Sequence, residues 1–225
     1  MSSKESDERR RQVEAADVFR RFVRASVGAT PTKMDSEELL DALNATLVHL
    51  GVRRAARLDS GTSSSLSARF VSSMKRNGGL RVVKWSDDEP IVIRENDAVA
   101  QSLCERLMRT EEGDEHHAIM GRLLGYGCPW VPSSVDQCWM FDFVVFFRRS
   151  NDDFKSRESG WLGGFKCGGA LSQPRFLRLL TKYNRDFVAP ANRFLAGASV
   201  RVRGIVYVVD HFEVTARPPS NSKSR

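Results

Sequence analysis

Cysteine is scarce in this chain, and its few copies fall in no disulfide-rich or zinc-binding pattern. Four cysteines occur among the 225 residues, and none of them belongs to a Cys-x-x-Cys pair. A small disulfide scaffold and the usual paired-cysteine zinc modules are therefore excluded. Such sparse thiols are typical of reduced cysteines, so we expect an intracellular protein of the cytoplasm or the nucleus.

Long apolar segments are missing as well. The longest apolar run, residues 139–147, is interrupted by Asp142 and is far shorter than the roughly 20 residues that a membrane-spanning helix needs. Residues 1–8 have no apolar core and carry acidic side chains, unlike a secretory signal or a mitochondrial transit peptide. We therefore expect no transmembrane segment, and disorder at residues 1–8 and in a tail at residues 218–225.

Acidic residues are outnumbered by basic ones. The chain has 35 lysines and arginines against 28 aspartates and glutamates, which gives a net charge of +7 and a pI of about 9.5. This excess favours polyanionic partners such as nucleic acid, or an acidic protein surface, although a soluble protein with a merely basic surface has the same composition. A chain of this length can bury a substantial core without disulfides or metal.

The first part of the chain, residues 9–95, has the pattern of helices followed by a β-hairpin. The predicted elements are helices at residues 9–27, 35–50 and 66–76 and strands at residues 80–85 and 91–94. Helix, short element, helix and hairpin is also the element order of a winged helix, although many α+β domains share it. This part is therefore predicted to be helical with a hairpin, and to be winged-helix-like as one alternative.

The second part, residues 96–217, combines helices with long apolar strands. The central strands are predicted at residues 138–147 and 200–216, where apolar residues alternate as in an antiparallel sheet packed on helices. Residues 148–159 are expected to form a charged loop and residues 160–169 a glycine-rich loop or hairpin. A helix that follows them is expected to break at Pro190. The sequence as a whole predicts an α+β protein with helices packed on a mainly antiparallel sheet.

Basic side chains in the first part are candidate contacts to nucleic acid or to an acidic partner. In a winged helix the second helix of the pair enters the major groove and the hairpin touches the backbone. The candidates are Arg53, Arg54, Arg57, Arg69, Lys75, Arg76, Arg81 and Lys84. The alternative interpretation is a solvated basic face that contacts no partner.

Two aspartates lie within apolar strands and are candidate catalytic residues. On the alternating pattern Asp142 shares a face with Met140, Val144 and Phe146, and Asp210 lies between Val208 and Phe212. A carboxylate on an apolar face is unfavourable by several kcal/mol unless it is paired or binds an ion. If the two strands are neighbours, the two acids can share a proton or hold a divalent metal. Otherwise each acid is paired with its own arginine or histidine.

His117, Cys128 and Cys138 supply ligands of the kind that bind zinc. A cysteine with His117 also has the composition of a nucleophile and its base. The intervals between these residues match no usual zinc spacing, and His116 and His117 diverge by about 100° on a helix. A hydrogen-bonded structural histidine is the alternative interpretation. No cofactor is expected other than a divalent metal at these residues or at the aspartate pair.

Residues 117–126 carry a short motif, His-x-x-x-Gly-x-Leu-Leu-Gly-Tyr, followed by a cysteine and a proline. The motif resembles one in uncharacterised proteins of large DNA viruses, in which a proline usually follows the tyrosine. Here Gly127 follows it and the proline comes at residue 129. The resemblance implies a viral origin and a place in the virion, but no activity.

These observations lead to three hypotheses of function. The first is a non-enzymatic binding or assembly protein whose basic surface contacts nucleic acid or an acidic protein. The second is a metal-dependent hydrolase or nuclease that uses Asp142 and Asp210, with His117 beside them; it requires carboxylates that converge in a cleft. The third is a purely structural subunit of a larger assembly, which requires neither an exposed basic surface nor a converging site.

Overall fold

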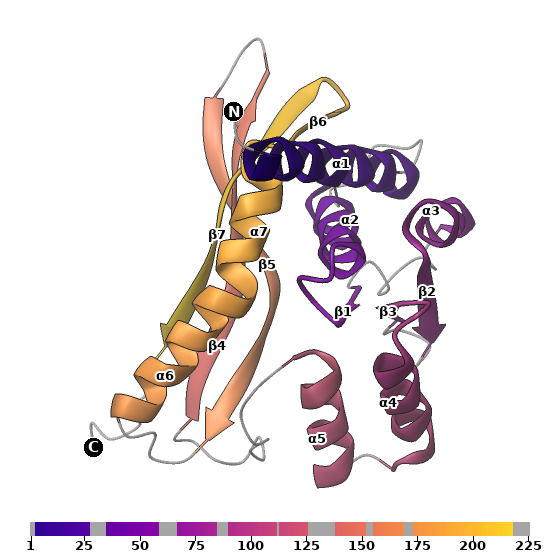
Figure 1. The fold of residues 1–225 in the computed structure, drawn as a ribbon, viewed down its shortest axis with the longest axis vertical. Coiled ribbons are helices and arrows are strands. Elements are labelled where there is room, and N and C mark those ends of the chain that lie inside the picture. Colours follow the sequence, from indigo (N-terminus) through magenta and orange to yellow (C-terminus); the bar gives the residue numbers. More distant parts are fainter. Residues whose placement is uncertain are drawn as a thin grey trace.

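The computed structural model describes eight stretches of the chain (Figure 1). They are residues 3–27, 35–58, 67–84, 90–111, 113–125, 138–151, 155–168 and 173–217. Within these stretches, helices pack against two antiparallel sheets of three and four strands, which confirms the predicted α+β class. None of the helices described combines the length and the apolar character that crossing a bilayer requires.

The first helix, α1 (Ser3–Ser26), starts earlier than the sequence pattern indicated. The expected disorder of residues 1–8 is therefore wrong from Ser3 onward, while the predicted tail at residues 218–225 lies outside the described residues. Glu8 of α1 pairs with Arg193 at 3.3 Å. Acidic side chains also suit the positive end of a helix dipole. This polar anchoring extends the helix beyond its apolar stripe, so apolar spacing alone did not detect it.

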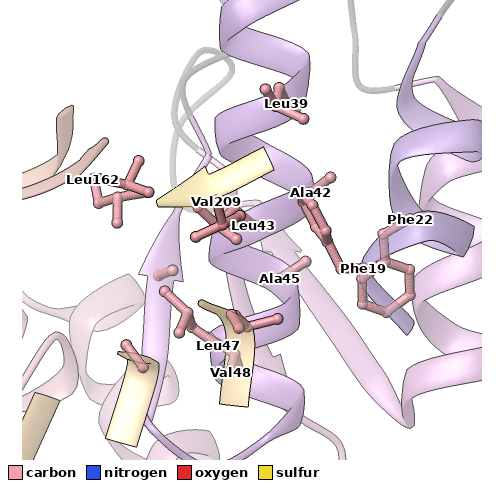
Figure 2. Close-up of a cluster of buried hydrophobic side chains, with 14 of the residues drawn as sticks. Phe19, Phe22, Leu39, Ala42, Leu43, Ala45, Leu47, Val48, Leu162 and Val209 are labelled. Atoms are coloured by element: carbon pink, nitrogen blue, oxygen red, sulfur yellow. The ribbon is translucent and has the colours of Figure 1, made fainter. Parts of the chain in front are cut away.

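The second helix, α2 (Asp35–His49), lies in the middle of the main hydrophobic core. It buries Leu39, Leu43 and Leu47, which the helical spacing predicted. Around it lie Phe19 and Phe22 of α1, and Leu162 and Val209 of the four-stranded sheet (Figure 2). A helix surrounded in this way is hydrophobic on more than one side, because it packs on several elements at once.

The three-stranded sheet contains the predicted hairpin. Its strands, in the spatial order β1-β3-β2, are β1 (Ala55–Arg57), β2 (Leu80–Lys84) and β3 (Pro90–Arg94). Helix α3 (Ala68–Gly78) precedes the hairpin and packs on α1, where the rings of Phe22 and Phe70 meet edge to face at 6.2 Å. The element order expected of a winged helix is therefore present, and the winged-helix assignment stays a prediction.

Two further helices cover the other face of this sheet (Figure 1). They are α4 (Ala98–Arg109) and α5 (Asp114–Leu123). Side chains from β1, β2 and β3 form a second, smaller core with these two helices. The motif at residues 117–126 therefore begins on α5, and its last residue lies outside the described residues.

The four-stranded sheet is antiparallel throughout and has the order β5-β4-β7-β6. Its strands are β4 (Cys138–Ser150), β5 (Lys155–Gly168), β6 (Ser199–Val202) and β7 (Ile205–Arg217). The expected loop at residues 148–159 is wrong over most of that range, since it includes the end of β4 and the start of β5. Residues 160–168, expected as a loop or hairpin, continue β5, which pairs antiparallel with β4. The strand predicted at residues 200–216 is instead a hairpin, which turns at Arg203 and Gly204 with φ angles of 48° and 82°.

One face of this sheet is covered by helices from both ends of the chain. From the C-terminal part come α6 (Gln173–Tyr183), a π-helical turn η1 (Asn184–Val188) and α7 (Ala189–Leu195), which run along the sheet in Figure 1. The predicted break at Pro190 does not occur. Pro190 lies in the first turn of α7, where its missing N–H is tolerated, directly after the widened π turn.

The main core includes buried side chains from both sides of residue 95, among them Phe19 and Leu43 before it and Phe143 and Phe212 after it. Helix α2 packs both on the three-stranded sheet and on β5, and α1 packs on α2, α3, α7 and β6. The division of the chain into parts at residue 95 stays a prediction, but the two parts share one apolar interior.

Candidate nucleic-acid interface

Five basic side chains lie exposed on α3 and on the edge strand β2. We call this group the α3–β2 basic surface, and its members are Arg69, Lys75, Arg76, Arg81 and Lys84. Arg69 and Arg76 are seven residues apart, about two turns of helix, so they project from the same side of α3. On β2, Arg81 and Lys84 point to opposite faces of the sheet, since Arg81 alternates with buried Leu80 and Lys84 follows buried Val83.

No acidic side chain balances these cations within the described part of the chain. None of the five forms an ion pair with another described residue, and neither α3 nor β2 contains an aspartate or a glutamate. In the sequence, no acidic residue occurs between Asp59 and Asp87. The five charged side chains of this surface are therefore all positive, an arrangement that attracts a polyanion.

Arg53, one of the predicted partner contacts, lies in the interior instead. Its residue is 6% exposed, and its Nη1 donates to Oδ1 of Asn44 and to the carbonyl of Leu162, both at 2.8 Å. Its guanidinium also lies 6.0 Å from the ring centre of Phe143 and 5.7 Å from that of Phe187. The prediction that Arg53 contacts a partner is therefore wrong, because its charge is used to join parts of the core.

Arg54 and Arg57 also differ from the expected surface. Arg54 forms an ion pair with Asp97, with 3.6 Å between Nε and Oδ2, and it directly precedes β1, away from α3 and β2. Arg57 is exposed, but it lies on β1, at the opposite edge of the three-stranded sheet from β2. Of the eight basic candidates, five are thus exposed on the neighbouring elements α3 and β2, and three lie elsewhere.

The candidate carboxylate Asp142 is 6% exposed and engaged on all sides. The guanidinium of Arg217 donates to its Oδ2 at 2.7 Å and 3.1 Å, and the indole N–H of Trp161 donates to its Oδ1 at 3.0 Å. Gly164 lies opposite Asp142 in the sheet, and a Cβ at that position would lie 2.6 Å from Oδ1 of the aspartate. Asp142 is therefore a paired structural carboxylate with no free side for an ion.

Asp210 is paired separately. Arg148 lies 3.1 Å from its Oδ1, and Arg157 and His211 lie 3.6 Å and 3.4 Å from its Oδ2. Strands β4 and β7 are indeed neighbours, but Asp142 faces Thr215, and Asp210 comes next to the residue that faces Phe146. Four residues of strand separate the two positions, about 14 Å. The predicted shared acidic site is therefore wrong, and with it the hydrolase that required Asp142 and Asp210 to meet.

Of the candidate metal ligands, only His117 has a described side chain, and it does not lie at those carboxylates. His117 lies on α5, which packs on the three-stranded sheet, and its ring stands edge to face with that of His116 at 5.7 Å. Cys128 and the side chain of Cys138 lie outside the described residues. Among the residues that the structure describes, no three histidines, cysteines or carboxylates are grouped as a metal site requires.

Sequence reasoning missed the exposed face of the four-stranded sheet, on which Trp161 is 51% exposed. Both faces of β4 are apolar in sequence, so alternation showed which residues share a face but not which face is covered. The sequence did not indicate β5, because this segment contains several glycines and glycine is depleted in strands. Comparisons of the chain with models of protein families, with curated proteins and with solved structures return no match, so its function is inferred from this geometry.

Proposed function

We propose that this protein is a non-enzymatic nucleic-acid-binding protein whose α3–β2 basic surface contacts the phosphate backbone. The observation that carries the proposal is the set of five exposed cations without an acidic partner among the described residues. Exposed lysines and arginines of this kind neutralise phosphates and release counterions on binding. An exposed helix followed by a hairpin also offers two neighbouring elements for one duplex.

Salt dependence is the property that this proposal predicts most directly. Each phosphate that is neutralised on a duplex contributes about −0.9 to the slope of log K against log salt concentration. If all five cations take part, the affinity should fall about 10²- to 10³-fold between 50 and 200 mM salt. A protein that serves only as a structural subunit would show no such salt-sensitive binding.

The test is fluorescence anisotropy with a labelled duplex of about 30 base pairs and mixed sequence, titrated at several salt concentrations. The double variant R69A/R76A should weaken binding at least tenfold at low salt and reduce the salt slope by about 2. The matched control is R175A/R178A, which removes two exposed charges from α6 on the helical side of the other sheet. It should change the affinity less than twofold.

Two outcomes would contradict the proposal. One is duplex binding that is the same for wild type and R69A/R76A, which would exclude the α3–β2 basic surface as the contact. The other is tight binding of an acidic polypeptide, tested with polyglutamate, without measurable binding of the duplex. That result would assign the surface to an acidic protein partner.

The proposal extends to where the protein acts. A nucleic-acid-binding role requires a compartment in which nucleic acid is accessible, either the cytoplasm or the nucleus. The resemblance of residues 117–126 to proteins of large DNA viruses adds the virion to these locations. Fractionation of infected or expressing cells, with detection of the protein by mass spectrometry, distinguishes the three.

A further inference from the structure

A second surface lies on the outer face of the four-stranded sheet. On β4, Phe141, Phe143 and Val145 are buried under the helices, and the alternating residues Val144 and Phe146 point to the other face. Helices α6 and α7 lie on the inner face (Figure 1), and α1 and α2 contribute to the same buried core. In the described part of the chain no helix packs on the outer face, on which Trp161, Arg157 and Glu213 are exposed.

Aromatic rings occupy three adjacent strands of this outer face. Trp161 of β5 is 51% exposed and lies opposite Val144 of β4. Two residues further along β4, Phe146 stacks on His211 of β7, with ring centres 4.5 Å apart and an angle of 9° between the planes. Two residues along a strand correspond to about 7 Å, so the indole and the stacked pair lie at neighbouring positions.

The orientation of Trp161 is fixed by a buried group. Its indole N–H donates to Asp142 at 3.0 Å, and Asp142 is itself held by Arg217. Gly164 leaves the room that this contact needs, because a Cβ there would lie 3.3 Å from the indole nitrogen and 2.6 Å from the carboxylate. A buried, paired carboxylate thus holds a half-exposed indole in one position, which reduces the entropy that a ligand must overcome on binding it.

Arginines flank the rings at both ends. Arg217 lies at one end of the face, and Arg148 and Arg157 lie at the other. Their side chains are 66%, 57% and 75% exposed. Each pairs with Asp142 or Asp210, but a guanidinium has five N–H donors, and one carboxylate occupies no more than two of them. The remaining N–H groups of these exposed side chains can donate hydrogen bonds to the oxygens of a phosphate.

We infer that this outer face binds single-stranded nucleic acid, with bases stacked on Trp161 and on the Phe146–His211 pair and phosphates held by Arg148, Arg157 and Arg217. An antiparallel four-stranded sheet with helices on one face and aromatic rings on the other is a recurrent platform for unpaired bases. Only unpaired bases expose the faces that stack on such rings. This surface is separate from the α3–β2 basic surface and does not depend on it.

The composition of the face favours nucleic acid over a protein partner. The centre of a stable protein interface is apolar and depleted of charge. Here charged side chains surround the rings, and Glu213 lies across Val144 from Trp161 with 49% of its side chain exposed. The carboxylate of Glu213 should repel a bound phosphate, so removing its charge should strengthen the binding of the strand. A merely structural role of Glu213 would not produce that result.

The test compares the affinities of full-length protein for a labelled single strand of twenty thymidines and for a duplex of equal length, by anisotropy. The wild type should bind the single strand, and W161A should weaken that binding at least fivefold, in line with the loss of one stacked base. R157A should weaken it about threefold, while R175A on the covered side of the sheet should not. E213Q should strengthen it about twofold.

Several results would overturn the inference. They can be distinguished from results that contradict duplex binding by the α3–β2 basic surface. The R69A/R76A variant should lower the affinity for the duplex and leave the affinity for the single strand nearly unchanged. If W161A does not fold, R157A and E213Q still test the inference, because both positions are exposed and these variants should keep the fold. Unchanged single-strand affinity in R157A and E213Q would exclude this face. So would concentration-dependent dimerisation in sedimentation that W161A abolishes, which would assign the face to a second copy of the chain.

Discussion

The side chain of Arg53 and the backbone carbonyl of Leu162 are joined by a hydrogen bond of 2.8 Å across 109 positions of sequence. The same nitrogen donates to Asn44 of α2, so one buried guanidinium connects the segment before β1, helix α2 and strand β5. The rings of Phe143 and Phe187 lie against it. Arg53 thereby joins the four-stranded sheet to helix α2, which also packs on the three-stranded sheet.

Replacing Arg53 by alanine should destabilise the fold by about 3 kcal/mol, because two buried acceptors lose a charged donor. R53K should restore only part of this loss, since an ammonium cannot reproduce the planar geometry of the guanidinium. R54A is the matched control, and its loss of a half-exposed ion pair with Asp97 should be worth less than about 1 kcal/mol. Denaturant unfolding measures all three, and equal losses for R53A and R54A would contradict a structural role for Arg53.

Local signals in the sequence were sufficient for α2, for α3 and for the first hairpin. The spacing of Leu39, Leu43 and Leu47 predicted α2, and two apolar runs around a polar turn predicted β2 and β3. β5 was missed because glycines and charges interrupt its alternation, and its strand conformation is imposed by pairing with β4 along its whole length. Such pairing is a tertiary effect that outweighs local propensity.

The candidate site was harder to predict, because charge in a sequence does not specify burial. Arg53, Arg54 and Arg69 are all arginines in the first part of the chain. Arg53 is buried, Arg54 is paired with Asp97, and Arg69 is exposed without an ion pair to a described residue. The alternation placed Asp142 correctly with Val144 and Phe146, but the register that separates it from Asp210 depends on long-range strand pairing. Five of the eight basic candidates lie on two neighbouring elements, α3 and β2, and all five are exposed.

Asp97 should be a main source of acid sensitivity. It caps α4 by accepting from the N–H of Ala100 at 3.0 Å and also accepts from Arg94. Burial alone would raise its pKa, but these hydrogen bonds, with the charges of Arg54 and Arg94, hold the pKa below its usual value of 3.8. Because the folded-state pKa is depressed, the stabilisation is present above pH 3.8 and is lost as the pH falls through the folded-state pKa.

The D97A variant should lose about 1 to 2 kcal/mol of stability at pH 7 through loss of the cap. D97N keeps an oxygen that can accept from Ala100 and removes the charge, so it should retain more stability than D97A. It should also show a smaller loss of stability than wild type on acidification from pH 5 to pH 3. Thermal unfolding at the two pH values gives the comparison, and equal acid sensitivity in wild type and D97N would exclude Asp97 as a source.

Cys104 should be chemically inert in the folded protein. It is 3% exposed, and burial raises the pKa of its thiol from 9.0 to about 11; Arg81 opposes this shift and Glu105 adds to it. The thiolate, which is the reactive form, is therefore scarce at pH 8. Iodoacetamide at pH 8 should leave the Cys104 peptide unmodified in native protein and alkylate it in denaturant. Rapid alkylation of native Cys104 would contradict its burial.

The raised pKa of Cys104 also predicts a loss of stability at high pH. The unfolded thiol ionises at lower pH than the folded one, so its contribution is complete below pH 9.0 and is lost as the pH rises toward about 11. The C104A variant lacks this titration. Its melting temperature should therefore fall less than that of wild type between pH 8.5 and pH 10.5, and identical falls would show that the thiol makes no contribution.

Gly164 should tolerate no side chain, because it lies against both the carboxylate of Asp142 and the backbone of β4. A Cβ would lie 2.6 Å from Oδ1 of Asp142 and 2.7 Å from the carbonyl oxygen of Phe141, and the backbone atom cannot move without disturbing the sheet. We expect G164A to destabilise the protein by about 1 to 3 kcal/mol, as overpacking commonly does. It should also alter the near-ultraviolet circular dichroism of the indole that Asp142 holds.

S159A, an exposed position on the same strand and face, should change neither the stability nor the circular dichroism. A G164A protein with wild-type stability and an unchanged spectrum would show that Asp142 and Trp161 are not held as closely as their hydrogen bond of 3.0 Å indicates.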